Sequence, residues 1–96
     1  MATEQKLGGW TAPRKATPEV QEYADKVKKR AEAAGNRKFT EYETISYRQQ
    51  LVAGVNYMIT IDTGGDSFIY LRLFVSLDGE VHFKSATEGN PDPDKE

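Results

Sequence analysis

Apolar and polar positions follow two different periods along this chain, with the change near Lys38. Between residues 17 and 36, apolar side chains recur every three or four positions, which is the spacing of an amphipathic helix. Beyond Lys38 they alternate with polar side chains, and β-branched and aromatic residues become frequent, as in half-buried strands. The pattern predicts one helix followed by a series of strands.

Both ends of the helix carry recognisable signals. Thr17 is a suitable N-cap, Pro18 fits the first helical position, and Glu19 faces the positive end of the helix dipole. Gly35 and Asn36 supply a stop, because such residues accept the left-handed conformation at a helix C-terminus. The side chains expected to face the core are Val20, Tyr23, Ala24, Val27, Ala31 and Ala34.

Four strands are expected after the helix. The apolar spacing in the first slips from three to two, which predicts a bulge or bend near Glu43. Glycine-containing turns at 63–66 and 78–79 predict tight hairpins, since glycine tolerates positive φ. The third strand has one apolar face and one mixed face that is expected to stay partly open to water. The predicted strands span residues 39–52, 55–62, 68–75 and 81–84.

One apolar helix stripe and one apolar sheet face must cover each other, so the predicted fold is α+β in two layers. The sheet is expected to be antiparallel, with four to five strands and one α-helix packed across it. Residues 1–16 lack a periodic pattern and are expected to form an extended N-terminal arm. A single domain is expected over residues 1–90. Residues 88–96 at its end are acidic and contain proline, which predicts a frayed tail.

Composition narrows the possible functions. A chain of 96 residues accommodates one domain, and a net charge of −2 gives no overall basic field for a nucleic acid or an anionic membrane. No stretch approaches a membrane span, and the N-terminus lacks the apolar core of a signal peptide. The absence of cysteine excludes disulfides and thiolate chemistry and suits a reducing compartment, so we expect a cytoplasmic protein.

No set of residues predicts catalysis, a cofactor or a metal ion. His82 is the only histidine and has no cysteine to activate, so an exposed position at the sheet edge is favoured over a role as general base. Glu41 and Glu43 are interpreted as solvated carboxylates on one strand face. The Gly64-Gly65 pair lacks the helix start and the spacing of a phosphate-binding loop. An enzyme is therefore disfavoured.

Three segments carry apolar or small residues where polar ones are usual. They are 50–56 between the first two strands, 7–10 in the arm, and 76–79 at the last hairpin. Alternate turns of an antiparallel meander lie at the same end of the sheet, so these segments could line up as a ridge that fits a cleft. Other interpretations stay open: Trp10 is expected to fold back on the helix, and Leu77 could be ordinary strand-end packing. Gly54 could be only a turn residue, and Gln50 a strand end with a solvated amide.

These residues resemble the stefins, the intracellular, disulfide-free branch of the cystatins that inhibits papain-like cysteine proteases. The resemblance covers roughly Leu7 to Val75. It depends on 16–19 at the helix start, on Gln50-Leu51-Val52-Ala53-Gly54, which matches the Gln-x-Val-x-Gly loop of the family, and on Asn56-Tyr57 after it. The second stefin loop usually carries Leu-Pro; here Leu77 matches and Asp78 replaces the proline. The aromatic ending of typical stefins is also missing.

The resemblance implies a cystatin-like fold and a reversible, tight-binding competitive inhibitor of papain-like, cathepsin-type proteases, acting as a three-part wedge. A non-inhibitory or engineered binding module on the same scaffold is the alternative. A monomer is expected, and straightening of the first hairpin loop could give a domain-swapped dimer. The implied protease-binding residues are Leu7, Gly8, Gly9, Gln50, Leu51, Val52, Ala53, Gly54, Leu77 and Asp78.

Overall fold

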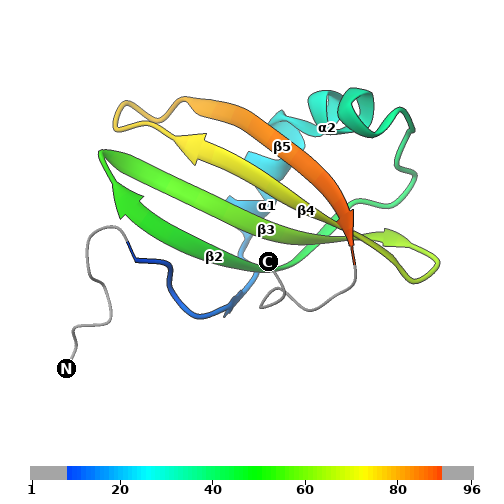
Figure 1. The fold of residues 1–96 in the computed structure, drawn as a ribbon, viewed down its shortest axis with the longest axis horizontal. Coiled ribbons are helices and arrows are strands. Elements are labelled where there is room, and N and C mark those ends of the chain that lie inside the picture. Colours follow the sequence, from blue (N-terminus) through cyan, green and yellow to red (C-terminus); the bar gives the residue numbers. More distant parts are fainter. Residues whose placement is uncertain (1–8, 90–96) are drawn as a thin grey trace.

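A five-stranded antiparallel sheet forms one layer of the protein and two short helices form the other (Figure 1). The computed structural model describes residues 9–89. Neighbouring strands follow chain order, so the sheet is a simple meander, and the predicted α+β class is confirmed. The elements are β1 (Arg14–Lys15), α1 (Pro18–Lys26), α2 (Lys28–Gly35), β2 (Glu43–Val52), β3 (Gly54–Gly64), β4 (Ser67–Val75) and β5 (Val81–Gly89).

The single helix expected from the sequence is in fact two, because the chain departs from helical geometry at Val27, where φ is −111° and ψ is 13°. The Val27 N–H turns back to the Ala24 carbonyl at 3.2 Å, which closes α1 with a tighter turn. The break directs α1 toward β2 and α2 toward β5. Both helices therefore stay in contact with the twisted sheet, whereas one straight helix would diverge from it. Ala34, predicted on the core-facing stripe, is exposed after this change of direction.

Both helix ends behave as their sequences indicate. The Thr17 hydroxyl accepts a hydrogen bond from the Val20 N–H at 3.2 Å, so Thr17 is the N-cap, and Pro18 occupies the first turn. Asn36 adopts the left-handed conformation at the end of α2, with φ of 56°.

The first long strand begins later than predicted, at Glu43 instead of residue 39. The pairing register shifts between Thr44 and Ser46, so the bulge expected near Glu43 is present, at Ile45. Before the strand, the Phe39 ring is buried and stacks on Tyr42 with ring centroids 5.6 Å apart. These two side chains fill the space beneath the helices without strand pairing, which explains their three-residue spacing.

The last strand is longer than predicted and continues to Gly89. Glu88, assigned to the tail from sequence, pairs with Ile69 across the sheet, and its carboxylate lies 2.5 Å from the Arg37 guanidinium. The rest of the predicted tail, residues 90–96, lies outside the described residues.

The arm also contains more regular structure than expected. Arg14 and Lys15 form β1 and pair with Tyr47 and Ser46 of β2, which makes the fifth strand of the sheet. The arm therefore runs antiparallel to β2 at the edge of the sheet.

The core lies between the helices and one face of the sheet. The opposite, outer face is mixed as predicted: Arg72 of β4 is exposed, whereas its neighbour Tyr70 is buried. Within residues 9–89, no helix is long and apolar enough to cross a membrane. The buried core cluster comprises Val20, Ala24, Val27, Ala31, Phe39, Tyr57, Ile59, Ile61, Ile69, Leu71, Leu73 and Val75.

Candidate functional site

Two hairpin turns lie side by side at one end of the sheet, which is the left end in Figure 1. The first joins β2 to β3 through Ala53, and the second joins β4 to β5 through 76–80. Val55 pairs with Val75, which in turn pairs with Val81, so the strand ends that carry the turns are in register. We call residues 51–54 and 76–80 the hairpin edge.

The N-terminal arm runs toward the same edge. The Thr11 N–H donates to the Gln49 carbonyl at 2.8 Å, and the Gln49 N–H donates to the Thr11 hydroxyl at 3.1 Å. Trp10 pairs with Gln50, so the antiparallel direction brings exposed Gly9 toward the first turn. Leu7 and Gly8, the other predicted site residues of the arm, lie outside the described residues.

Trp10 does not fold back on the helix, contrary to the expectation from sequence. The Arg72 guanidinium carbon lies 5.8 Å from the centroid of the Trp10 ring, and Arg72 belongs to the outer face of the sheet. The two side chains border a hollow of about 310 Å³ together with Gln50, Asn56 and Lys84. Pairing of the arm with the edge strand β2 directs the indole to the face opposite the helices.

Large apolar side chains are exposed at both turns. Leu77 is 85% exposed at the tip of the second turn and Val52 is 39% exposed at the first. Among the described residues, the only other large hydrophobic residue in this exposed class is Ile45, at 42%, which lies at the bulge of β2. Leu77 is therefore not ordinary strand-end packing.

Both the backbone conformation and the surrounding atoms require a glycine at position 54. Its φ is +117°, a value that L-residues rarely adopt. A Cβ atom there would lie 2.6 Å from Phe74 Cζ and 2.7 Å from the Val75 carbonyl oxygen. The first turn is thus packed directly onto β4, and Ala53 is left exposed at its tip.

Gln50 is tied across the same hairpin. Its side-chain Oε1 accepts a hydrogen bond from Asn56 Nδ2 at 2.9 Å, and the two residues are directly paired on β2 and β3. Leu51, next along the strand, is half-buried and pairs with Val55. The amide of Gln50 is therefore engaged within the protein, unlike the solvated strand end considered from sequence.

Side-chain hydrogen bonds shape the second turn. The Ser76 hydroxyl donates to the Asp78 carboxylate and accepts from the Glu80 N–H at 3.2 Å. The Gly79 N–H closes the turn on the Ser76 carbonyl at 2.9 Å, and φ of Gly79 is +90°. The Glu80 N–H also donates to the Asp78 carboxylate, at 3.4 Å. The hydrogen bond from Ser76, followed by the one from the Glu80 N–H, lowers the pKa of Asp78. Asp78 thus fixes the loop through hydrogen bonds to its carboxylate.

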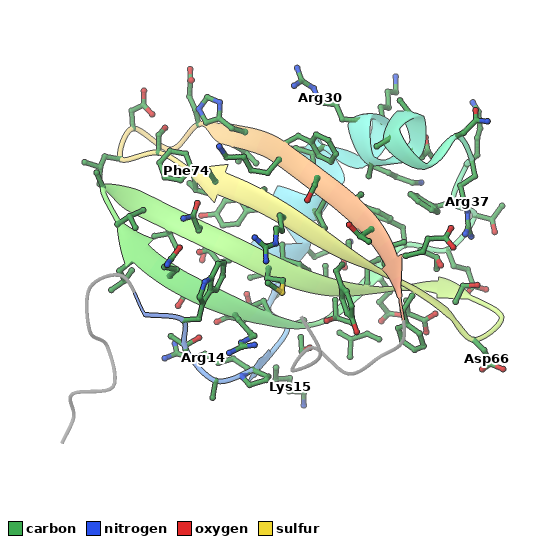
Figure 2. The ribbon with its side chains drawn as sticks, in the orientation of Figure 1. Arg14, Lys15, Arg30, Arg37, Asp66 and Phe74 are labelled. Atoms are coloured by element: carbon green, nitrogen blue, oxygen red, sulfur yellow. The ribbon has the colours of Figure 1, made fainter. Side chains whose placement is uncertain are left out.

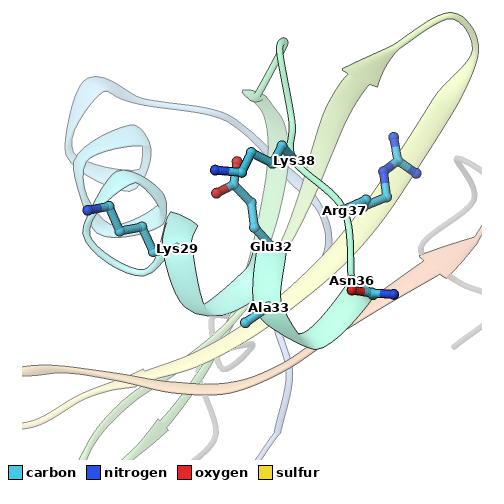
Figure 3. Close-up of a pocket in the computed structure, with 6 residues that line it drawn as sticks. All are labelled: Lys29, Glu32, Ala33, Asn36, Arg37 and Lys38. Atoms are coloured by element: carbon cyan, nitrogen blue, oxygen red, sulfur yellow. The ribbon is translucent and has the colours of Figure 1, made fainter.

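Other features lie away from this edge or lack reactive geometry. His82 is half-exposed and stacks on Phe74, and its Nε2 lies 3.7 Å from Glu80 Oε1. Within the described range, no three His, Cys, Asp or Glu side chains are close enough to hold a metal ion. A hollow of about 530 Å³ lies beside the end of α2, away from the hairpin edge (Figure 3). Lys29, Glu32 and Lys38 border it, and the Glu32 carboxylate accepts the Phe39 N–H at 2.9 Å.

Sequence reasoning missed two supports of the hairpin edge. Phe74, which lies against Gly54, was noted only as part of a mixed strand face, and no local signal identifies its contact. Ser76 carried a signal that could have been used, because a serine two residues before an aspartate in a tight turn favours such side-chain hydrogen bonds.

A meander sheet backed by helices, with two apolar hairpins at one end, defines a small protein of the cystatin-like α+β class whose exposed surface is suited to binding another protein. The cystatin domain matches residues 8–89, and the chain belongs to the cystatin family. Its relatives include type 1 members, among them a stefin and cystatins A and B.

Three relatives illustrate the similarity. Leukocyte cysteine proteinase inhibitor 1 of Sus scrofa is 47% identical over 78 residues, covering 80% of this chain and 76% of the relative. Cystatin-A of Mus musculus is 45% identical, covering 76% and 75%. Cystatin-B of Mus musculus is 44% identical, covering 76% and 74%. The name of the pig protein describes an inhibitor of cysteine proteinases and not an enzyme.

Proposed function

We propose that this protein is a reversible, tight-binding competitive inhibitor of papain-like cysteine proteases of the cathepsin type. The hairpin edge and the arm together enter the active-site cleft and exclude substrate. The proposal places the protein in the cytoplasm as a monomer with no cofactor. It follows the activity in the name of the pig relative and the stefin type of the other relatives.

The observation that carries the proposal is the exposure of Val52 and Leu77 at the same end of the sheet. Apolar side chains that stay in water at two adjacent turns gain free energy when a partner buries them. A standard interface of about 1,600 Å² is within reach of two hairpins and an arm, with a few apolar anchors supplying most of the affinity.

Blockade without cleavage follows from the shape of the first turn. A protease must hold an extended peptide bond within attack distance of its thiolate. The peptide bonds around Ala53 belong to a tight turn, which Gly54 packs onto β4 through Phe74. The turn therefore occupies the cleft without presenting an extended substrate.

The second loop takes part although Asp78 stands where stefins usually have proline. A proline restricts the backbone through its ring, whereas here Ser76 and the Glu80 N–H hold the Asp78 carboxylate. Leu77 is consequently presented on an ordered turn, which lowers the entropy lost on binding.

Steady-state inhibition of papain tests the function. We expect inhibition that substrate overcomes, and intact inhibitor by mass spectrometry after prolonged incubation with the enzyme. No inhibition at micromolar concentration would refute the proposal and would favour a non-inhibitory binding module. Parallel assays with an open-cleft endopeptidase and an occluded-cleft exopeptidase define the preferred protease.

Single alanine variants test the contribution of the hairpin edge. Val52→Ala and Leu77→Ala are each expected to weaken inhibition about tenfold or more, since buried interface anchors cost above about 1–2 kcal/mol when truncated. Ile45→Ala is the matched control, because Ile45 is similarly exposed but lies at the bulge of β2. Equal effects of all three variants would contradict this assignment of the binding surface.

Deleting residues 1–9 tests the arm, which contains the proposed contacts Leu7, Gly8 and Gly9. Weaker inhibition with unchanged thermal stability is expected. Unchanged inhibition would remove the arm from the mechanism.

The domain-swapped dimer expected from the sequence stays a prediction. Size-exclusion chromatography after mild heating tests it.

A further inference from the structure

The two turns of the hairpin edge share one aromatic neighbour. Phe74 lies near the end of β4, labelled in Figure 2, and its cross-strand partners are Asn56 on β3 and His82 on β5. It is therefore the central residue of three on the outer face, directly below both turns. Its side chain is half-buried.

On one side the Phe74 ring supports the first turn. Its Cζ and Cε1 atoms would lie 2.6 and 2.7 Å from a Cβ at Gly54, so the ring edge occupies the space that any side chain at Gly54 would need. The absence of that side chain allows the turn to settle onto the ring. Movement of the ring would change the height of the first turn above the sheet.

On the other side the same ring supports the second turn. The Phe74 and His82 rings stack with centroids 6.0 Å apart and an interplanar angle of 30°. His82 is the second residue of β5, which begins at Val81, and the Glu80 carbonyl just before the strand accepts the Ser76 N–H that closes the second turn, at 2.9 Å. The contact thus reaches the base of the loop that carries Leu77.

From these contacts we propose that Phe74 is a positioning residue that sets the separation of the two turns, so that Val52 and Leu77 reach a partner together. The inference rests on the proposed inhibition. Two anchors engage one rigid surface at full strength only if their spacing is already correct, because otherwise part of the binding free energy is consumed in ordering them.

The test compares Phe74→Leu with Phe68→Leu. Phe68 is on the same strand and the same face, is similarly half-buried, and pairs with Asp62 and Gly89 near the far end of the sheet. Both variants lose a ring, but only Phe74→Leu removes the contact beneath the turns. Inhibition of papain and backbone amide NMR shifts are measured for both variants and the wild-type protein, with thermal stability recorded as a control.

We expect Phe74→Leu to weaken inhibition about tenfold, the size of effect typical of residues that couple two neighbouring groups. Amide shifts should change at both 52–54 and 76–80. Phe68→Leu should alter neither inhibition nor these shifts, even where its loss of thermal stability is similar. Equal effects of the two variants, or changes confined to one turn, would overturn the proposal.

The NMR measurement separates this inference from the proposed function. If the wild-type protein does not inhibit papain, the function is wrong, yet the shifts still show whether Phe74 links the turns. If inhibition is present and Phe74→Leu leaves it and the shifts at either turn unchanged, only the positioning role fails. Phe74→Ala provides a second variant, expected to have a larger effect in the same direction.

Discussion

Replacing Gly54 by alanine tests the packing of the first turn most directly. The new Cβ would have to accommodate a φ of +117° and would meet Phe74 and the Val75 carbonyl at 2.6–2.7 Å. Unfavourable backbone geometry costs about 1–3 kcal/mol and overpacking a further 1–3 kcal/mol, so the free energy of unfolding should fall by about 3 kcal/mol.

Gly79→Ala is the matched control. Gly79 also lies in a hairpin turn with positive φ, +90°, but a Cβ there would have nothing within 4 Å. Gly79→Ala therefore has only the cost of the unfavourable backbone conformation, about 1 kcal/mol. Both substitutions lower the conformational entropy of the unfolded chain to the same extent, so this effect cancels in the comparison. The difference between the two variants, about 2 kcal/mol, measures the steric contact.

Urea denaturation followed by fluorescence gives both values, and Trp10, the only tryptophan, is a single optical probe close to the first hairpin. A thermal scan should show Gly54→Ala melting roughly 15 °C below wild type, at about 4–8 °C per kcal/mol for a domain of this size. If the two variants are destabilised equally, the contact with Phe74 and Val75 does not fix Gly54, and the steric argument is wrong.

Two further predictions concern ionisable groups. Burial raises the pKa of Tyr42, and burial with a hydrogen bond to Glu19 raises the pKa of Tyr23 to about 12. Because the unfolded chain ionises first, the contribution of both tyrosines to stability is complete below about pH 10 and is lost as the pH rises above it, through about 12 for Tyr23. Tyr42→Phe should therefore reduce the fall in the midpoint of urea unfolding between pH 9 and 11. The same fall in the variant and the wild-type protein would contradict this. At the second turn, Ser76→Ala should raise the pKa of Asp78 toward its ordinary value, measured by NMR titration of its carboxyl carbon, and an unchanged titration would show that the serine does not hold it.

Several elements were predictable because their signals are local. Thr17 and Pro18 fix the start of α1 through one side-chain hydrogen bond and one restricted φ, both properties of adjacent residues. Alternation along β3 and β4 assigned the core face correctly, since the side-chain period of a strand is two. The hairpin turns at 63–66 and 78–79 were located from their glycines for the same local reason.

The errors occurred where distant segments meet. Nothing near Val27 breaks a helix by itself, and the change of direction appears only when the stripe must follow a twisted sheet. Trp10 was expected on the helix, but pairing with Gln50 of an edge strand turned it to the outer face. Glu88 was assigned to a tail because residues 88–96 are acidic and contain proline, yet strand pairing with Ile69 includes Glu88 in the sheet.

The amino-acid sequence alone determined the order of the main elements, the core-facing side of β3 and β4, and the two turns with exposed apolar tips. These depend on conformational preferences and periodicity within a few residues. Only the tertiary structure decided how the turns are held relative to each other, through Phe74 against Gly54 and His82. That arrangement depends on contacts between strands far apart in the chain, and close packing of side chains in three dimensions sets their positions.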